Sequence, residues 1–406
     1  MISRRVDPAT VFVRGLGTTE GFEWGLWLAL TVFWIVELDL TPTRLVLLGI
    51  VLEGAVILSE TPTGVVADVY SRRRSLIIGQ VVMGIAFVAA FATTNFAVVL
   101  LSQVLIGFGW TFRSGADTAW VSDEVGGAGP LAENELEMIL IRRHRWGISL
   151  SLLIGPLTIA IGWWLSVQWA GIALGVSYTA LAAMLAATMT EDHFTPGRAR
   201  GDGFVTTLRN GIGTVRERPR LRILVVVILV FFLGVEVFDR LGYVHFLDNA
   251  GIDDLNESGE SLVALGILFF ILALGGIAVN KVAEHYLETG KGVVRLAVLL
   301  MGIAAVGGVI AAATSFVALI GVGYLLQDSV REALWPVMEG WANRDAPSEV
   351  RATVHSLMGQ TTSVGQIGGA VVFGAVAEAS SIPIAMAGGA ICFAVAGFVA
   401  TRGVAP

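Results

Sequence analysis

The sequence predicts an all-α integral membrane protein in which twelve transmembrane helices form two six-helix halves. Three observations lead to this fold class. The chain has 406 residues, of which 55% are hydrophobic and only 15% are charged, whereas soluble domains average about 25% charged residues. The apolar residues come in blocks of about 20 to 25, the length that crosses ~30 Å of hydrocarbon. One long polar stretch near the middle of the chain divides these blocks evenly.

The apolar blocks can be placed along the chain as twelve predicted spans. A short charged or polar patch separates each block from the next and marks a loop at the membrane surface. The predicted spans cover residues 12–37, 43–68, 75–94, 97–122, 146–166, 168–189, 221–246, 261–284, 294–313, 315–341, 350–377 and 382–401. The first block lacks the short apolar core and the small-residue cleavage site of a signal peptide, so we expect it to be retained as a span.

Basic residues indicate the orientation of these spans. Of the 26 Lys and Arg residues, only Arg44 falls in a predicted outer loop, whereas Arg72 to Arg74 and the run from Arg198 to Arg222 lie on the opposite side. The positive-inside rule therefore predicts that both termini are cytoplasmic. The composition is compatible with a bacterial plasma (inner) membrane, where we expect this multi-pass protein to reside.

The domain organisation predicted from the polar interruption has three parts. These are an N-terminal six-helix half at residues 1–190, a cytoplasmic linker at 191–219 and a C-terminal six-helix half at 220–406. A weak internal repeat supports a duplication, because Gly64-x-x-x-Asp68 after the second span corresponds to Gly276-x-x-x-Asn280 after the eighth. Two halves related by an axis along the membrane normal are typical of secondary transporters, whose substrate site lies between them near the midplane.

The loop between the second and third predicted spans carries a specific motif. Gly64 is followed after three residues by Asp68, then by a tight turn and the arginines Arg72 to Arg74. This pattern resembles the signature cytoplasmic loop of the major facilitator superfamily. The resemblance extends over the whole chain through the twelve spans and the central linker. Within the superfamily the chain looks most like the proton-coupled drug efflux members, the drug:proton antiporters.

The resemblance implies a cytoplasmic gate at this loop. Its residues would be Gly64, Asp68, Arg72, Arg73 and Asp123. The glycine lets one helix backbone approach its neighbour closely, and Asp68 at a helix end can face the positive N-terminal dipole of another helix. The two arginines can reach Asp123 at the inner end of the fourth span. Two positions depart from the family pattern, because Val69 replaces a basic residue and Ser71 replaces a glycine; we expect these changes to weaken the turn and one possible ion pair.

Ionisable side chains fall inside several predicted spans, where each costs roughly 2.5 to 3.5 kcal/mol on insertion scales and is a functional candidate by default. The candidates are Glu20, Glu23, Glu53, Arg113, Asp117, Glu236, Asp239, Arg240, Asp328 and Arg331. Arg113 and Asp117 are four residues apart, as are Glu236 and Arg240. At this spacing opposite charges can neutralise each other along one helix, which is the structural alternative to a functional role.

We expect the carboxylates near the middle of their spans to couple transport to protons or to recognise a cation. A transporter driven by protons needs a carboxylic acid whose pKa is raised by desolvation into the physiological range. Glu23 and Glu236 occupy corresponding places in the two halves, with Glu53 and Asp239 as further candidates. Arg113 resembles the span-four arginine of the superfamily's proton-coupled members, which implies coupling through its pairing with a carboxylate. The alternative is that these groups are buried structural hydrogen-bonders.

The fifth predicted span contains the pair Gly155-Pro156. This pair resembles the antiporter signature of the same superfamily, in which the missing backbone donor of proline bends the helix and the glycines permit close packing. The glycine pair that usually follows the proline is reduced here to a lone Gly162. The pair favours export over uptake.

Other chemistries find no support in the sequence. The five histidines show no metal-ligand spacing, and the chain has no glycine-rich nucleotide loop with Lys-Ser or Lys-Thr and no nucleophile with a plausible base. A single cysteine, Cys392, cannot form an intramolecular disulfide. We therefore expect a transporter rather than an enzyme, without a metal or other cofactor and with a proton gradient as its energy source.

The sequence thus predicts a secondary transporter that works by alternating access and exports small amphipathic or cationic compounds against protons. Its predicted partners are a small-molecule substrate, protons and the lipid bilayer, with no nucleic acid, and we expect a monomer. The alternatives are proton-linked or facilitative uptake of a small metabolite, and a membrane sensor that binds a ligand without transporting it.

Overall fold

A computed structural model of the chain describes residues 6–127, 133–194, 213, 215–252, 257–288, 292–346 and 351–403. Helices make up nearly all of these residues, and no β-strand occurs among them. Most of the predicted linker at 191–219 lies outside the described residues, since its positions 195–212 and 214 are not among them.

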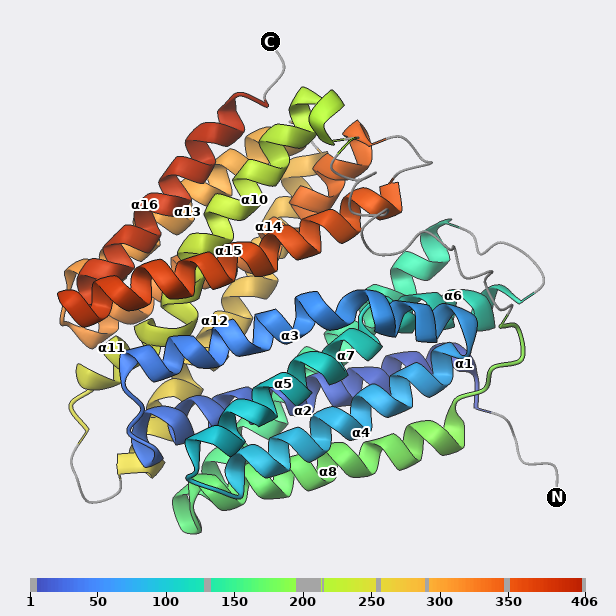
Figure 1. The fold of residues 1–406 in the computed structure, drawn as a ribbon, viewed down its shortest axis with the longest axis horizontal. Helices are drawn as coiled ribbons and strands as arrows, with labels where there is room; N and C mark the ends of the chain where they lie inside the picture. The colour runs from blue at the N-terminus through green and yellow to red at the C-terminus, as the bar shows by residue number, and fades with distance from the viewer. Residues whose placement is uncertain are drawn as a thin grey trace. The chain divides into compact units, whose positions relative to one another are not determined.

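The first part of the chain folds into helices joined by short turns (Figure 1). They are α1 (Pro8–Thr10), η1 (Val11–Leu16), α2 (Gly17–Val32), η2 (Phe33–Glu37), α3 (Pro42–Val69), α4 (Arg72–Phe91), α5 (Phe96–Arg113), α6 (Ala116–Gly126), α7 (Glu133–Trp164) and α8 (Val167–Thr188). The segments η1 and η2 are π-helical turns that continue α1 and α2 without a break. Side chains that accept hydrogen bonds from the first turn cap several of these helices, as Asn95 does for α5 and Ser166 for α8.

The second part of the chain also consists of helices. Its helices are α10 (Pro219–Val237), η3 (Phe238–Gly242), α11 (Tyr243–Asp248), α12 (Glu257–Glu288), α13 (Val293–Ala313), α14 (Val317–Asp345), α15 (Arg351–Ala379) and α16 (Ile382–Thr401). The π-helical turn η3 joins α10 to α11, so these three elements form one continuous rod.

A helix occupies each of the twelve places where the sequence predicts a span, but not all are equally apolar. In the described part of the chain, nine helices are long and apolar enough to cross a membrane. The others are the rod from Pro8 to Glu37, α14 and α15. Their length suffices, but they carry more polar side chains, such as Glu20 and Glu23 in α2 and Asp328 in α14. The nine apolar helices establish a multi-pass membrane protein, and the three polar ones hold four of the ten candidate residues, Glu20, Glu23, Asp328 and Arg331.

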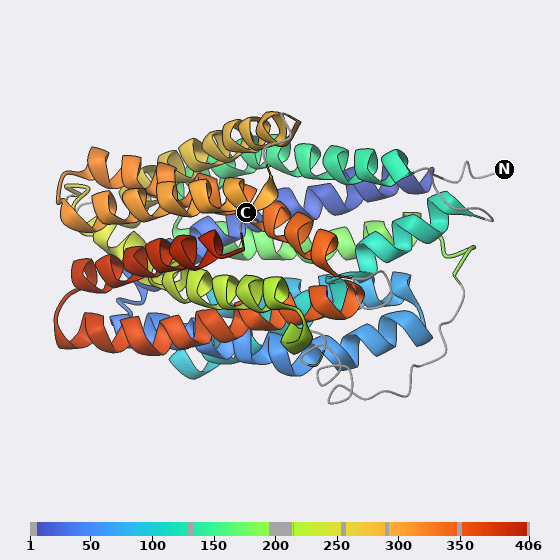
Figure 2. The same cartoon turned by 90° about the horizontal axis from the view of Figure 1, so that it is seen from above.

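The chain divides into two compact units. Unit 1 comprises Met1–Asp39, Gly54–Gly201 and Asp254–Gly266, and unit 2 comprises Leu40–Glu53, Asp202–Asp253 and Ile267–Pro406. The helices α3 and α12 therefore each contribute one part to each unit. Within unit 1, α4 packs between α5 and α8, and α2 packs against α7 and α8 (Figures 1 and 2). Within unit 2, α13 packs against α14 and α16, and α10 packs against α15 and α16.

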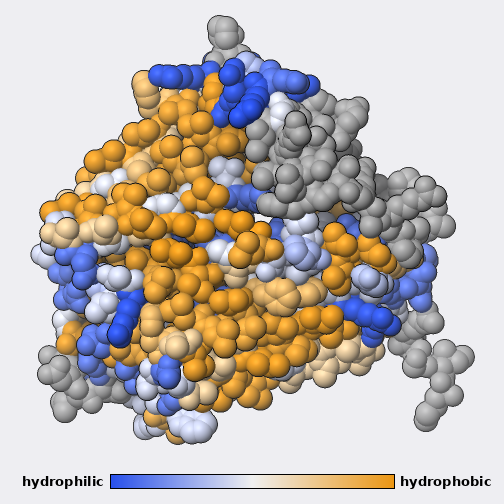
Figure 3. Space-filling view, viewed as in Figure 1, coloured by the Kyte–Doolittle hydropathy of each residue, from blue (hydrophilic) through white to orange (hydrophobic). Residues whose placement is uncertain are grey.

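Glycines allow these helices to approach closely, as is typical inside membranes. In unit 1 a Cβ at Gly79 of α4 would lie 2.7 Å from the carbonyl oxygen of Gly109 in α5. In unit 2 a Cβ at Gly307 of α13 would lie 2.6 Å from the carbonyl oxygen of Gly323 in α14. Figure 3 shows apolar side chains along the helix flanks and hydrophilic ones near helix ends. The interior of each unit is thus tightly packed, and charged groups inside it must find partners there.

Candidate functional site

A buried ion pair lies at the centre of unit 1. The Arg113 guanidinium at the end of α5 donates to Glu23 Oε1 on α2. The Tyr178 hydroxyl on α8 donates to the same oxygen at 2.6 Å and lies 2.5 Å from Arg113 Nη1. Glu23 and Arg113 are each 8% exposed, and Tyr178 is fully buried. The predicted candidates Glu23 and Arg113 therefore neutralise each other, and Tyr178 is a partner that sequence reasoning missed.

A break in the fourth span gives Arg113 this position. The helix α5 ends at Arg113, and Gly115 adopts φ +73°, a left-handed conformation that favours glycine, before α6 begins. Across this break Asp117 and Arg113 form no ion pair with each other. The alternative that these two charges neutralise each other along one helix is therefore not what the structure shows, because the spacing rule requires an unbroken helix.

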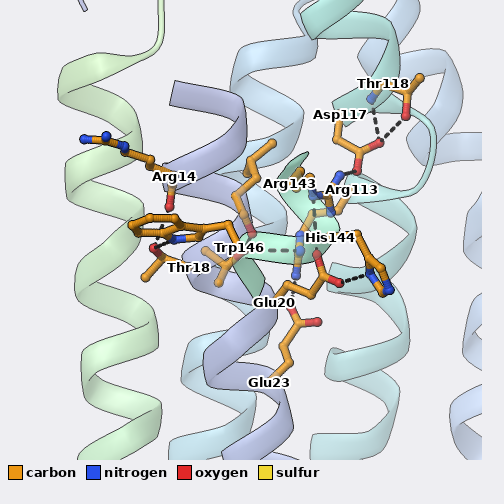
Figure 4. A network of polar contacts seen from close by, with 12 residues as sticks. Arg14, Thr18, Glu20, Glu23, Arg113, Asp117, Thr118, Arg143, His144 and Trp146 are labelled. Carbon is orange, nitrogen blue, oxygen red and sulfur yellow. Dashed lines mark hydrogen bonds and ion pairs between the residues drawn. The ribbon is translucent and has the colours of Figure 1, made fainter. Parts of the chain in front are cut away.

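Asp117 instead belongs to a second network in unit 1, which Figure 4 shows beside the first. Its carboxylate accepts from the Arg143 guanidinium of α7 and from the backbone N–H of Thr118. Arg143 also lies 3.6 Å from Glu20 Oε2, and His144 Nδ1 lies 2.8 Å from Glu20 Oε1. Sequence reasoning placed Arg143 and His144 in an inner loop, but α7 extends back to Glu133 and includes both residues.

A third network lies in unit 2, around the π-helical turn η3. Arg331 of α14 donates through Nη1 to both carboxylate oxygens of Asp239, at 2.7 and 2.8 Å, and Nη2 lies 2.8 Å from Asp328 Oδ1. The Tyr324 hydroxyl donates to the carbonyl oxygen of Phe238, the first residue of η3. Since π-helical turns occur frequently at functional sites, the turn that carries Asp239 and Arg240 is a candidate functional position.

Glu236 and Arg240 pair one turn apart at the start of this region. Arg240 Nε lies 3.0 Å from Glu236 Oε1, as their spacing predicts. Glu236 is 1% exposed, and its second oxygen, Oε2, has no hydrogen-bond partner among the described residues. Gly49 of α3 lies directly against this pair, because a Cβ there would collide with Glu236 Oε1. Glu53, one turn further along α3, has the Ser363 hydroxyl as a hydrogen-bond partner.

The motif after the second span forms one of the contacts predicted for it. The Arg72 guanidinium binds Asp123 of α6 and donates to the carbonyl oxygen of Ala119 at 2.9 Å. Asp68 lies 3.8 Å from Arg72 and its side chain is 67% exposed. At Gly64 an added Cβ would meet no atom within 4 Å, so close helix approach does not explain this glycine within the described residues.

Arg73 does not reach Asp123, contrary to the prediction. Its guanidinium instead donates to the carbonyl oxygens of Met189 and Ala186 at the C-terminal end of α8. Glu191 then returns from α8 to the first turn of α4, where it accepts from the Arg73 backbone N–H at 2.9 Å and from the Ser71 hydroxyl at 2.5 Å. Arg73 of α4 thus caps the C-terminal end of α8, and Glu191, just after α8, caps the N-terminal end of α4. Helix dipoles favour both contacts, because a cation lies at a C-terminal end and a carboxylate at an N-terminal end.

Ser71 does not weaken the turn, which corrects a second expectation. Its φ of 179° is extended backbone that any residue adopts, so no glycine is needed there. Its hydroxyl accepts from the Arg74 backbone N–H at 2.9 Å and serves as the N-cap of α4. The departure from the family pattern therefore adds a helix cap.

The pair Gly155-Pro156 lies inside α7 without close packing around the glycine. A Cβ at Gly155 would meet no atom within 4 Å, and Pro156 lies on the exposed face of the helix. The prediction of close packing at this glycine is wrong. Gly147 and Gly162 are the tightly packed glycines of α7, against Glu20 and Leu262 respectively.

No group of three metal-ligating side chains comes together among the residues that the structure describes. The networks consist of carboxylates, guanidiniums and hydroxyls inside apolar helices. The fold and these networks together define a multi-pass membrane protein of the transporter class.

Comparison with known proteins identifies the family. Residues 16–371 match the model of the Major Facilitator Superfamily, so the chain belongs to that superfamily and is a secondary transporter. No curated protein sequence matches the chain.

Several solved structures that match this chain are structures of transporters. A mutant of the nucleoside transporter NupG has a TM-score of 0.81 at 14% identity, and the match covers 98% of this chain and 100% of that one. A POT family transporter in complex with a thioalcohol-conjugated peptide has a TM-score of 0.75 at 13% identity, with 96% and 95% covered. A bacterial homolog of the human lysosomal transporter Spinster, inward-facing and unoccupied, has a TM-score of 0.68 at 12% identity, with 98% and 95% covered. At these identities the similarity shows the fold alone.

Proposed function

We propose that this chain is a proton-coupled transporter that exports small amphipathic or cationic compounds by alternating access. The observation that carries the proposal is the buried Glu23–Arg113 pair with its Tyr178 hydroxyl. A buried ion pair persists only while both partners are charged, because the loss of one charge leaves the other uncompensated in a medium of low dielectric constant. Protonation of Glu23 therefore changes the position of Arg113.

The proposed coupling step follows from these contacts. With Glu23 ionised, Arg113 and Tyr178 share its Oε1, and the three helices α2, α5 and α8 are held together. A proton on Glu23 removes the charge that holds Arg113 and leaves the guanidinium with its remaining partners, among them the Thr19 hydroxyl, which already accepts from Nη2 at 3.4 Å. Since Arg113 ends α5 directly before the break at Gly115, its release also frees the junction with α6.

Cation recognition is assigned to unit 2, where carboxylates outnumber guanidiniums. Glu236, Asp239 and Asp328 share two arginines, Arg240 and Arg331, and Glu53 adds a fourth carboxylate that forms no ion pair with either of them. Glu236 contributes an oxygen without a hydrogen-bond partner among the described residues. A buried excess of negative charge favours a cationic solute over an anionic one. The aromatic side chains Tyr243 and Tyr324, which stack at 5.4 Å, are themselves buried and form part of the apolar surroundings of this network.

The direction of transport rests on the Gly155-Pro156 pair, which resembles the antiporter signature. The rival is uptake of a small metabolite by proton-linked or facilitative transport. The solved structures with this fold include a nucleoside transporter and peptide-binding POT transporters, so metabolite uptake is a concrete alternative. The proposal also includes a plasma-membrane location, cytoplasmic termini and a monomer that needs no cofactor and binds no nucleic acid.

Inverted membrane vesicles that contain the protein provide the test. The vesicles are energised to acidify their lumen, and a pH-sensitive dye reports proton efflux as compounds from a panel of cationic, neutral and nucleoside-like molecules are added. The proposal predicts dequenching that requires both the protein and a cationic or amphipathic compound, and that disappears in Glu23→Gln. A matched control is Glu378→Gln, an exposed carboxylate that accepts from Thr43 and is expected to behave as wild type.

Two results would contradict the proposal. Dequenching by nucleoside-like molecules alone would show that the protein exports metabolites rather than cationic or amphipathic compounds. No response to any compound from protein that is shown to be folded would favour metabolite uptake or a membrane sensor without transport.

A further inference from the structure

An arginine in the first π-helical turn lies over a tryptophan of α7. The Arg14 guanidinium carbon of η1 is 5.6 Å from the centre of the Trp146 ring. The indole N–H of Trp146 donates to the Thr18 hydroxyl at 3.1 Å, and that hydroxyl donates to the Arg14 carbonyl oxygen. In Figure 4 Arg14 points away from Glu20 and His144. The π-helical turn thus places an arginine and an indole together outside the polar interior.

Two more arginines share this surface. Arg142 lies four residues before Trp146 and therefore on the same face of α7, and Arg145 adjoins that face; both are exposed. Arg14, Arg142 and Arg145 form no ion pair with any described residue. The nearby acidic groups, Glu20 and Asp117, are already bound by Arg143 and His144. The surface therefore carries three positive charges without a protein counter-charge among the described residues.

The same face of α7 continues as an apolar stripe. Leu153, Leu157 and Trp164 are 68%, 49% and 82% exposed. Trp146 and Trp164 lie about 27 Å apart along the helix at ~1.5 Å per residue, close to the ~30 Å thickness of the hydrocarbon core. Tryptophan is enriched at both membrane–water interfaces. The two rings therefore place the arginine surface at the headgroup level of one leaflet, with a lipid-facing wall beneath it.

We propose that Arg14, Arg142, Arg145 and Trp146 form a binding site for the phosphate headgroup of an anionic phospholipid. Guanidinium groups recognise phosphate through several charge-assisted hydrogen bonds, and basic pockets between membrane helices are typical of anionic-lipid sites. The acyl chains lie along the Leu153–Trp164 stripe, which a free phosphate ion could not use. This site does not depend on the transport function proposed above, because its side chains contact none of Glu23, Arg113 and Tyr178.

Native mass spectrometry of the full-length protein in detergent tests the site. Palmitoyl-oleoyl phosphatidylglycerol and the zwitterionic phosphatidylcholine of the same chains are added in separate titrations. We expect wild type to retain phosphatidylglycerol at about tenfold lower lipid concentration than the triple variant Arg14→Gln/Arg142→Gln/Arg145→Gln, since each basic residue near the membrane adds to anionic-lipid affinity. The three side chains are exposed, so the variant is expected to fold, and its thermal unfolding is compared with wild type.

A matched control is Arg402→Gln, which removes another exposed arginine stacked on an aromatic ring, Phe398 at 5.6 Å. It is expected to retain phosphatidylglycerol as wild type does. Equal retention of the lipid by wild type and the triple variant would overturn the proposal, as would equal retention of phosphatidylcholine and phosphatidylglycerol by wild type. Displacement of the lipid by millimolar inorganic phosphate would show a general anion site and would also overturn the lipid assignment.

Discussion

Arg113 is the residue on which the interior of unit 1 depends most. Its guanidinium is the only charged partner of Glu23 among the described residues, and both side chains are almost fully buried. We expect Arg113→Ala to abolish transport and to lower stability by about 3 to 5 kcal/mol, because removal of one partner leaves a buried charge uncompensated. Thermal unfolding of the purified protein and transport in vesicles measure the two effects.

The double variant Glu23→Gln/Arg113→Ala separates charge from packing. It removes both charges, so it is expected to unfold at a higher temperature than Arg113→Ala alone. An equal loss of stability in the single and double variants would show that Arg113 acts through packing. Transport at the wild-type rate in Arg113→Ala would remove Arg113 from the mechanism.

Ser71 gives a second prediction at the scale of one residue. We expect Ser71→Ala to lower stability by about 1 kcal/mol, because the side chain caps α4 and also binds Glu191. Glycine, the residue usual in the family, is tolerated at helix N-caps at a cost of a few tenths of a kcal/mol, so Ser71→Gly is expected to lose less. Thermal unfolding of both variants and of Ser166→Ala, the equivalent cap of α8, provides the comparison. Identical unfolding of Ser71→Ala and wild type would show that this cap adds no stability.

At the scale of single residues the sequence identified the charged groups but not all of their partners. Glu236 with Arg240 was predictable because both lie on one unbroken helical rod. Arg113 with Glu23 and Tyr178 was not, because these residues come from three helices distant in the sequence. Glu191 was also missed, since an acidic residue just after a span looks like an ordinary loop residue. The only signal for its role was that the backbone N–H groups at the start of α4, at Arg73, and the carbonyl groups at the end of α8, at Met189, need hydrogen-bond partners outside their own helices.

At the scale of helices, glycines fall into two groups that predict different responses to the same substitution. A Cβ at Gly79 would lie 2.7 Å from the Gly109 carbonyl oxygen of the neighbouring helix, whereas a Cβ at Gly64 would meet no atom within 4 Å. We expect Gly79→Ala to lower the unfolding temperature clearly, because α4 and α5 would have to separate. Gly64→Ala is expected to leave it unchanged or slightly higher, since alanine favours helices by about 0.5 to 1 kcal/mol over glycine.

Thermal unfolding in detergent measures both glycine variants under the same conditions. Similar unfolding temperatures would contradict the packing described for α4 and α5. If Gly64→Ala folds as wild type and still loses transport, Gly64 acts in a state other than the one described, which is what the gate hypothesis requires.

The helices themselves were largely predictable, because apolar length is a strong signal. Their interruptions were less so. The π-helical turns at η1 and η3 have no simple sequence signature, and the break at Gly115 occurs inside a stretch that reads as one apolar span. These interruptions position Arg14, Asp239 and Arg113. The positions of these residues therefore depend on local backbone geometry, which residue spacing in the sequence does not predict.

At the scale of the whole molecule, the arginine distribution predicts which side of the membrane each loop faces. In a background with Cys392→Ser, a cysteine at Thr93 between α4 and α5 is expected to react with a membrane-impermeant maleimide in intact cells. A cysteine at Arg145, at the opposite end of unit 1, is expected to react only after the membrane is permeabilised. The reverse labelling pattern would contradict cytoplasmic termini and the positive-inside assignment.

The central claim is that protonation of Glu23 couples the proton gradient to transport. The most direct measurement compares two activities of Glu23→Gln in proteoliposomes with a compound found in the vesicle screen: exchange of labelled for unlabelled compound without a gradient, and accumulation driven by an imposed pH gradient. We predict that exchange persists while gradient-driven accumulation is lost, because exchange of bound compound does not require the carboxylate to change its protonation state. Gradient-driven accumulation at the wild-type level in Glu23→Gln would contradict the account.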